Sequence, residues 1–371
     1  MADLATAFER YAGWAADVTP LYETLASAAA ADERLLDIAA AAPEGQPAPQ
    51  LLLAAVHSLL LEGESHPLTL FYPTCRGDEV TFVDGDTPSA DGDTATADGD
   101  PAAGNPVPHF REFCLANEAK LRERIASRRV QTNDVGRSAV LLPAFTHVHR
   151  RTDPDSLALI ELGASAGLNL NWDRYGYRYG RNNTGDDDAV RRAGDPDSPV
   201  TIETDVRGAE RVLLPPSLPP VPWRVGVDEN PLDPTETANA RWLHALVHPD
   251  QPGRHRRLDA ALAVARRHQP TVVEGDAVTE LPRLLGAAPP DAALVVFSTH
   301  FLYQLPSEAV DRLREILAAH SRYRPVDWLS IDPDADLGTP VYRRVAFRDG
   351  DAAERQLAQF ESYGDWLRWF E

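Results

Sequence analysis

The spacing of apolar residues divides the chain into a part with helical periodicity and a part with strand-like runs. Between residues 4 and 62, and again over Phe110–Ala126, apolar positions recur every three or four residues. From about residue 151, short apolar runs alternate with amphipathic helical stretches, which is typical of βα units. The pattern therefore predicts an all-helical N-terminal region over residues 1–150 and an α/β domain over residues 151–371.

The α/β part is expected to form parallel strands followed by an antiparallel hairpin. The strands are predicted at Leu157–Ile160, Trp223–Val227, from Thr271, Ala292–Phe297 and Asp327–Ile331, and helices at Thr237–Val247, Arg256–His268 and Ser307–Ala319. Val341–Phe347 and Arg355–Phe360 flank Asp349-Gly350, a pair typical of tight hairpin turns. Residues 172–222, which include a strand pattern at Thr201–Val206, are expected to be an insertion over the strand ends.

A turn of small residues follows the first predicted strand and is the clearest candidate for a ligand site. The strand ends in Glu161, and Gly163-Ala164-Ser165-Ala166-Gly167 leads to a helix start. Glycine permits positive φ and lets a ligand approach the main chain closely. The N–H groups at a helix start favour an electron-rich ligand group. The alternative interpretation is an ordinary strand-to-helix turn.

Acidic residues close the next two predicted strands. Asp228 is placed to accept hydrogen bonds from the two hydroxyls of a ribose. Asp276, followed by Ala277, suits the amino group of an adenine. Since ligands of open α/β sheets bind outside the carboxyl ends of the strands, we expect both carboxylates near the turn. Either carboxylate can instead cap the helix that follows it.

Two other polar features are candidates for the chemistry. His300 follows the fourth predicted strand, where a histidine can take a proton from a nucleophile, and the alternative is a hydrogen-bonded histidine at the rim. The polar run Gln131–Arg137 stands between two apolar helical patterns. Its side chains Asn133, Asp134 and Arg137 either face the ligand or cap the next helix.

Several stretches together resemble an uncharacterised prokaryotic family, DUF2332, both in their residues and in their order along the chain. They are L-L-L-A-A-V-H-S-L-L-L with H-P-L, V-Q-T-N-D-V-G-R, E-L-G-A-S-A-G-L-N-L-N-W-D-R-Y, G-D-P-D-S-P-V, D-E-N-P-L-D, V-H-P-D-Q-P and V-V-E-G-D-A. The resemblance covers nearly the whole chain outside an acidic segment. The family name implies no activity, but it makes Gln131–Arg137 a family motif as well as a possible cap.

The small-residue turn also resembles the first motif of the Rossmann-like S-adenosylmethionine-dependent methyltransferases, acid-x-G-x-G-x-G, with serine at the middle glycine. The resemblance implies a methyltransferase-type sheet interrupted by the insertion at 172–222. It implies that S-adenosylmethionine contacts Glu161, Gly163, Ser165, Gly167, Asn169, Asp228, Asp276 and Ala277. Ser298-Thr299-His300 replaces the Asn/Asp-Pro-Pro-aromatic motif of enzymes that methylate amino groups in nucleic acids. The sequence also lacks the Pro-Cys nucleophile of cytosine carbon methylation.

The negative charge of the chain makes a nucleic-acid partner less expected. The formal net charge is −21, and Lys120 is the only lysine among 36 Lys and Arg residues. An acidic, lysine-poor surface predicts adaptation to high salt, and it disfavours a nucleic-acid partner, which needs a basic patch. The acidic segment 84–106 repeats Asp-Gly-Asp and has too few apolar residues to fold, so it is expected to be a disordered insertion.

The sequence predicts a cytoplasmic protein without a metal site. No apolar run reaches the roughly 20 residues of a membrane span, and the acidic N-terminus does not match a signal peptide. Cys75 and Cys114 form no zinc or disulfide pattern. His244 and His248 have the spacing of H-E-x-x-H without its glutamate. The acids at 332, 334 and 336 imitate a calcium loop that lacks a closing glutamate, and we expect them to be solvated.

These observations predict methyl transfer from S-adenosylmethionine to a small-molecule acceptor, with the oligomeric state undefined. Because the sulfonium donor is already activated, such an enzyme needs mainly positioning and one base. A second hypothesis is a catalytically degenerate fold that binds a nucleoside-type ligand or a protein partner without turnover. A nicotinamide-dependent oxidoreductase fits less well, since G-x-x-x-G lacks the glycine order of that motif.

Overall fold

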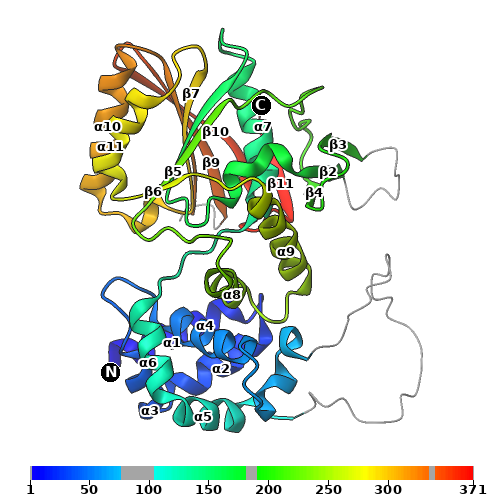
Figure 1. The fold of residues 1–371 in the computed structure, drawn as a ribbon, viewed down its shortest axis with the longest axis vertical. Coiled ribbons are helices and arrows are strands. Elements are labelled where there is room, and N and C mark those ends of the chain that lie inside the picture. The colour runs from blue at the N-terminus through cyan, green and yellow to red at the C-terminus, as the bar shows by residue number, and fades with distance from the viewer. Residues whose placement is uncertain (1, 77–103, 181–189, 334–338, 371) are drawn as a thin grey trace. The chain divides into compact units, whose positions relative to one another are not determined.

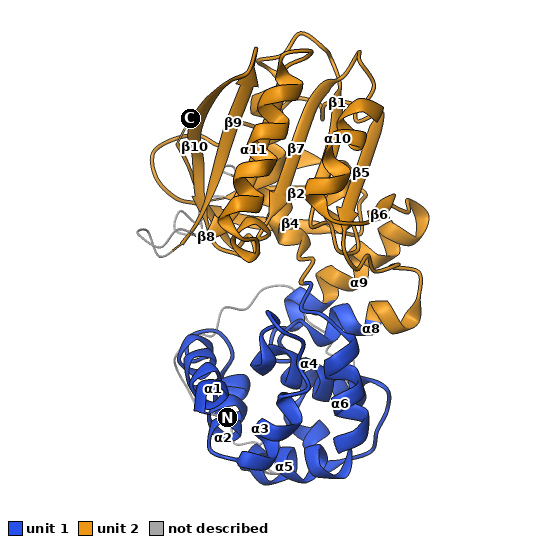
Figure 2. Cartoon of the chain, turned by 90° about the vertical axis from the view of Figure 1, so that its left-hand side faces the viewer, with its two compact units in different colours: residues 1–131, 241–255 blue, residues 132–240, 256–371 orange. Residues whose placement is uncertain are grey.

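The computed structural model describes residues 2–76, 104–180, 190–333 and 339–370, which form two compact units (Figures 1 and 2). Unit 1 contains residues 1–131 and 241–255, and unit 2 contains residues 132–240 and 256–371. Along the chain, the first boundary between the two units lies after residue 131. The reason is helix α7 (Ser138–His149), which is buried along nearly its whole length within unit 2.

Two predictions fall wholly or largely outside the described residues. The acidic segment predicted to be disordered, 84–106, is described only from residue 104. Of the acids that imitate a calcium loop, those at 334 and 336 also lie outside the described part of the chain.

The described secondary structure of unit 1 consists of helices. Its elements are α1 (Ala2–Ala15), α2 (Pro20–Ala30), α3 (Glu33–Ala39), α4 (Ala48–Leu61), η1 (Pro67–Phe71), η2 (Pro73–Cys75), α5 (Pro106–Ala116) and α6 (Glu118–Ser127). Every residue from 51 to 60 is buried, and α4 packs against α1, α3 and α6. Because α4 is apolar on all sides, it is buried as the core helix of the unit.

Unit 2 is built on one large sheet. Its strands are β1 (Leu157–Leu162), β2 (Gly176–Gly180), β3 (Arg191–Gly194), β4 (Thr201–Val206), β5 (Trp223–Asp228), β6 (Val272–Glu274), β7 (Ala293–Thr299), β8 (Val326–Pro333), β9 (Pro340–Arg348), β10 (Asp351–Phe360) and β11 (Trp366–Trp369). The other elements are η3 (Val135–Arg137), η4 (Leu168–Arg174), α8 (Thr237–Ala245), α9 (Pro252–Arg267), α10 (Ala277–Ala287), η6 (Leu302–Gln304) and α11 (Ser307–Ser321). Residues 241–255, from the second half of α8 to the first turn of α9, group with unit 1.

The order of the strands indicates where a sheet of this kind would bind a ligand. The described strands are arranged β3-β2-β4-β11-β10-β9-β8-β7-β1-β5-β6, and the run from β8 to β6 is entirely parallel. The chain goes from β1 to β5 and β6 on one side, then returns to β7 and β8 on the other. The strand order therefore reverses between β1 and β7, which is where ligands bind in open α/β sheets. The predicted α/β class is confirmed.

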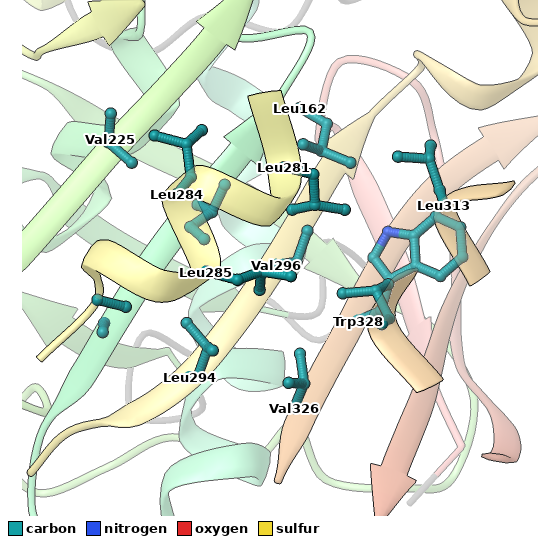
Figure 3. Packing of buried hydrophobic residues seen from close by; sticks show 14 of the residues in the cluster. Leu162, Val225, Leu281, Leu284, Leu285, Leu294, Val296, Leu313, Val326 and Trp328 are labelled. Carbon is teal, nitrogen blue, oxygen red and sulfur yellow. The ribbon is translucent and has the colours of Figure 1, made fainter. Parts of the chain in front are cut away.

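Helices cover both faces of β1. Ala158, Ile160 and Leu162 pack against α10 and α11, in the cluster that includes Leu281, Leu313 and other apolar residues (Figure 3). On the other face, the ring of Phe145 from α7 lies 5.3 Å from that of Phe297 and 4.9 Å from that of Trp172. Every residue of β1 is buried, as expected of a central parallel strand.

Residues 172–222 differ from the expected cover over the strand ends. They contain β2, β3 and β4, which continue the sheet beyond β11. The hydroxyl of the buried Tyr179 in β2 donates to the carbonyl of Ala139 in α7 at 2.7 Å, so this segment is part of the core.

The predicted C-terminal hairpin is confirmed. Strands β9 and β10 pair in antiparallel register, with Arg348 opposite Asp351. The two residues between them, Asp349 and Gly350, have φ of 55° and 95°. Positive φ at both central positions is the requirement of the tight turn that Asp-Gly favours.

Candidate functional site

The turn after β1 has the backbone conformation that its sequence predicts. Gly163 and Gly167 have φ of 70° and 68°. The amides of Gly163 and Ala164 both donate to the carbonyl of Val227 in β5, at 2.9 and 3.2 Å. Ser165 also has a positive φ, 53°, which is unusual for a residue with a side chain. The turn therefore stores backbone strain at the carboxyl edge of the sheet.

The space beside the two glycines is occupied by side chains of the protein itself. A Cβ on Gly163 would overlap the ring of Phe301, which follows β7. A Cβ on Gly167 would lie 2.8 Å from Cγ of Pro270. Both glycines are thus required by packing as well as by φ, and at Gly163 the packed side chain stands where a ligand would approach.

Asp228, the acid that closes β5, holds the turn through its carboxylate. One oxygen accepts from the amide of Ser165 at 2.8 Å and the other from the amide of Asn230 at 2.9 Å. The structure therefore brings Asp228 and the turn together, as the sequence predicts. A carboxylate can accept about four hydrogen bonds, so the same group can hold the turn and accept from a ligand hydroxyl.

Asn133 holds the same turn from a different element. Its side-chain oxygen accepts from the amide of Leu168 at 2.8 Å, and Leu168 is the first residue of η4. The neighbouring Asn169 is fully buried, and its side-chain oxygen accepts from the hydroxyl of Ser138 at 3.2 Å. Asn133 and Asp228 thus fix two backbone amides three residues apart, and both act as positioning residues of the turn.

The rest of the polar run 131–137 is a buried structural junction. Asp134 accepts from the amide of Gly136 at 2.8 Å and so caps η3, the alternative that its sequence allowed. It also lies 3.7 Å from the guanidinium of Arg257. Arg137 donates to the carbonyl and the hydroxyl of Thr299 at 3.3 and 3.2 Å, which connects η3 to the end of β7. Asp134 and Arg137 thus have structural partners at the edge where His300 also lies.

Glu161 is a buried acid behind the turn. It is fully buried, and within the described residues neither carboxylate oxygen has a hydrogen-bond partner. Burial raises the pKa of Glu161 well above its usual value, Arg137 opposes that shift and Asp228 adds to it. Because buried polar groups normally have partners, Glu161 is a group that a ligand donor could satisfy.

His300 lies at the end of β7 in a left-handed conformation, with φ of 55°. Its amide donates to the carbonyl of Ile331 in β8 at 2.6 Å. Burial and the nearby charge of Arg137 together lower the pKa of His300 to about 3, against the opposing effect of Asp134. The imidazole is therefore uncharged at neutral pH, where it can form hydrogen bonds but is a weak proton acceptor.

Asp332 is a site residue that the sequence analysis missed. It was expected to be solvated, but its side chain is buried, with 8% of its surface exposed. One oxygen accepts from the amides of Leu302 and Tyr303 at 3.0 and 3.4 Å. Burial raises the pKa of Asp332 to about 7, and the amide hydrogen bonds oppose that shift. Its position at the carboxyl end of β8 indicates a site residue, as it does for Asp228. The acids at 332, 334 and 336 instead suggest a calcium loop, and this pattern led to the prediction of a solvated side chain.

Substituting Asp332→Asn tests this buried acid, since asparagine keeps an acceptor oxygen and cannot ionise. Between about pH 4 and pH 7 the folded protein keeps a proton that the unfolded chain, with a usual pKa of 3.8, has lost. The stability of the wild type should therefore fall relative to that of the variant by about 1.4 kcal/mol per pH unit up to pH 7. Above pH 7 the difference should stay constant.

Urea unfolding over this pH range measures the difference. Asp332→Ala is the control, because it also loses the two amide hydrogen bonds. The difference in stability between the wild type and this variant should change with pH by the same amount per unit. The alanine variant should be less stable than the asparagine variant at every pH. A stability difference that does not change with pH would contradict the burial of an ionisable Asp332.

One known family matches this chain. The model of DUF2332, described as "Uncharacterized protein conserved in bacteria", matches residues 5–91 and 93–369. The chain belongs to the DUF2332 family. No curated protein and no solved structure matches it. The matched residues include every site residue described above.

The remaining predicted cofactor contacts of this DUF2332 protein lie one strand further out. Asp276 follows β6, the edge strand next to β5, and its carboxylate accepts from the amide and hydroxyl of Thr279 at 2.8 and 2.7 Å. It therefore caps α10, the alternative that its sequence allowed. Ala277 is the first residue of α10 and is buried in the apolar cluster. A contact of either residue with adenine stays a prediction.

The described residues of the DUF2332 chain contain no group of three or more His, Cys, Asp or Glu side chains that could hold a metal ion. In unit 1, Nδ1 of His244 lies 3.2 Å from Nδ1 of His255, and burial lowers the pKa of His248 to about 3.

Among the described helices, none is both long enough and apolar enough to cross a membrane.

Proposed function

We propose that unit 2 binds a nucleoside-type ligand at the carboxyl edge of its parallel strands and transfers a methyl group from S-adenosylmethionine to a small-molecule acceptor. The observation that carries this proposal is the contact between Asp228 and Ser165. It joins the acid that closes β5 to the strained turn after β1. The turn adjoins the reversal of strand order, the usual ligand position of such sheets.

The sheet supports a Rossmann-like fold as part of this proposal. Counted along the chain, the five parallel strands have the order 3-2-1-4-5, with β1 in the middle. This order matches part of the doubly wound arrangement that binds nucleotides. In this proposal the carboxylate of Asp228 accepts from the ribose hydroxyls while it also holds the turn.

The residues around the turn fit the other parts of S-adenosylmethionine. Glu161 is buried without a hydrogen-bond partner among the described residues, which suits an ammonium donor. Asn169 is likewise buried, and its side-chain nitrogen has no partner in the described part of the chain, which suits a carboxylate. When bound, S-adenosylmethionine supplies a methyl group that its sulfonium has already activated. The protein then has to hold donor and acceptor in line and exclude water.

A second candidate is a nucleoside-binding module without turnover. The uncharged His300, with a pKa lowered to about 3 by burial, favours it, because the histidine expected to act as base is a weak one at neutral pH. Methyl transfer to an acceptor that loses its proton to water needs no such base.

Isothermal titration of the full-length protein with S-adenosylhomocysteine, S-adenosylmethionine and NADH tests the proposal, at low and at high salt. We expect the first two ligands to bind in the micromolar range and NADH not to bind. Absence of binding by both S-adenosyl compounds at millimolar concentration would refute the proposed function. If they bind but no panel of small amines and hydroxyl compounds yields S-adenosylhomocysteine from S-adenosylmethionine, the second candidate is favoured.

A further inference from the structure

The ring of Phe301 lies directly against Gly163. A Cβ added to Gly163 would overlap Cδ2 and Cγ of that ring, and even the Cβ of Phe301 would be only 3.1 Å away. Gly163 is the first residue after β1, and Phe301 is the second after β7. Because β1 and β7 are the strands between which the order reverses, the ring lies where a ligand of such a sheet is expected.

The backbone that carries Phe301 is fixed on both sides. On one side His300 has a φ of 55°, and its amide is bonded to Ile331. On the other side Asp332 accepts from the amides of Leu302 and Tyr303. Phe301 itself belongs to no helix or strand and is half-buried. A rotation about the side-chain torsions would therefore move the ring without moving the segment that carries it.

We propose that Phe301 is a movable cover of the glycine turn, and that a nucleoside ligand binds only after the ring has left Gly163. This inference rests on the proposed function and adds the step that controls access to its site. In the closed arrangement the ring also packs against the apolar cluster beneath α10 and α11, which stabilises it there. The affinity measured for a ligand is then reduced by the fraction of molecules in which the ring is turned away.

Substituting Phe301→Ala removes the cover. If the ring is closed in about nine of ten molecules, the dissociation constant of S-adenosylhomocysteine should fall about tenfold. The association rate should rise by the same factor and the dissociation rate should stay unchanged, because only the closed state has been removed. Surface plasmon resonance with the immobilised full-length protein measures all three quantities.

Tyr303→Ala is the matched control, since Tyr303 is an aromatic residue of the same segment with 61% of its surface exposed. It should bind S-adenosylhomocysteine as the wild type does. Phe301→Leu keeps an apolar side chain in the cluster and should show a smaller increase in affinity for S-adenosylhomocysteine. It replaces the alanine variant in this test if that variant does not fold.

If the wild type binds S-adenosylhomocysteine and both folded Phe301 variants bind it equally well or more weakly, Phe301 does not act as a cover. The proposed function would be unaffected by that result. If the wild type and the variants all fail to bind S-adenosylhomocysteine, both proposals are refuted.

Discussion

Asp228→Ala is expected to weaken the binding of S-adenosylhomocysteine by at least about 100-fold, since two lost hydrogen bonds to a charged group are together worth about 3 kcal/mol. The substitution removes the proposed acceptor for the ribose hydroxyls. It also releases the amides of Ser165 and Asn230, so that the turn after β1 loses a side-chain anchor. Isothermal titration of the purified variant measures the loss.

Asp276→Ala is the control for this prediction. Asp276 also follows a strand of the parallel sheet, but its carboxylate is exposed and caps α10. If it acts only as a cap, the variant should lose about 1 kcal/mol of stability and bind the ligand normally. If it also contacts the adenine, the affinity should fall as well. Normal binding by a folded Asp228→Ala variant would remove the main support for the proposed function.

Gly136→Ala is expected to destabilise the protein by about 3 kcal/mol or more, because the added methyl group meets backbone atoms that cannot move independently. A Cβ on Gly136 would overlap the carbonyl of Tyr363, and a Cβ on the neighbouring Gly364 would overlap the carbonyl of Gly136. For a unit of this size the loss corresponds to a fall of about 10 °C in the midpoint of thermal unfolding.

Gly286→Ala is the matched control for that substitution. Gly286 lies inside α10, and apart from its chain neighbours and the backbone of its own helix no atom lies within 4 Å of an added Cβ. Alanine favours a helix more than glycine does, so this variant should gain about 0.5–1 kcal/mol. A Gly136→Ala variant as stable as the wild type would show that the segment at 363–364 can move away from η3.

The sequence predicts most of the sheet because buried parallel strands are short apolar runs. The predicted strand Thr201–Val206 has the bounds of β4, and Asp349-Gly350 forms the expected turn. Strand β2, Gly-Tyr-Arg-Tyr-Gly, lies in the segment that the sequence analysis assigns to an insertion. The alternation of Tyr177 and Tyr179, both buried, was the signal for that strand.

The site was harder to predict, because its contacts join residues far apart in the chain. Local sequence identifies Asp228 and Asp276 alike as acids at strand ends, yet one holds the turn and the other caps a helix. The roles of Asp332 and Phe301 depend on the adjacency of β1, β7 and β8 in the folded sheet. No periodicity in the sequence carries that information.

The most direct test of the central claim is a crystal structure of the full-length protein in complex with S-adenosylhomocysteine. We predict that the ribose hydroxyls lie within hydrogen-bond distance of the Asp228 carboxylate, that the ligand contacts the turn from Gly163 to Gly167, and that the ring of Phe301 has left Gly163. A ligand bound away from Asp228 and the turn would contradict the proposed site.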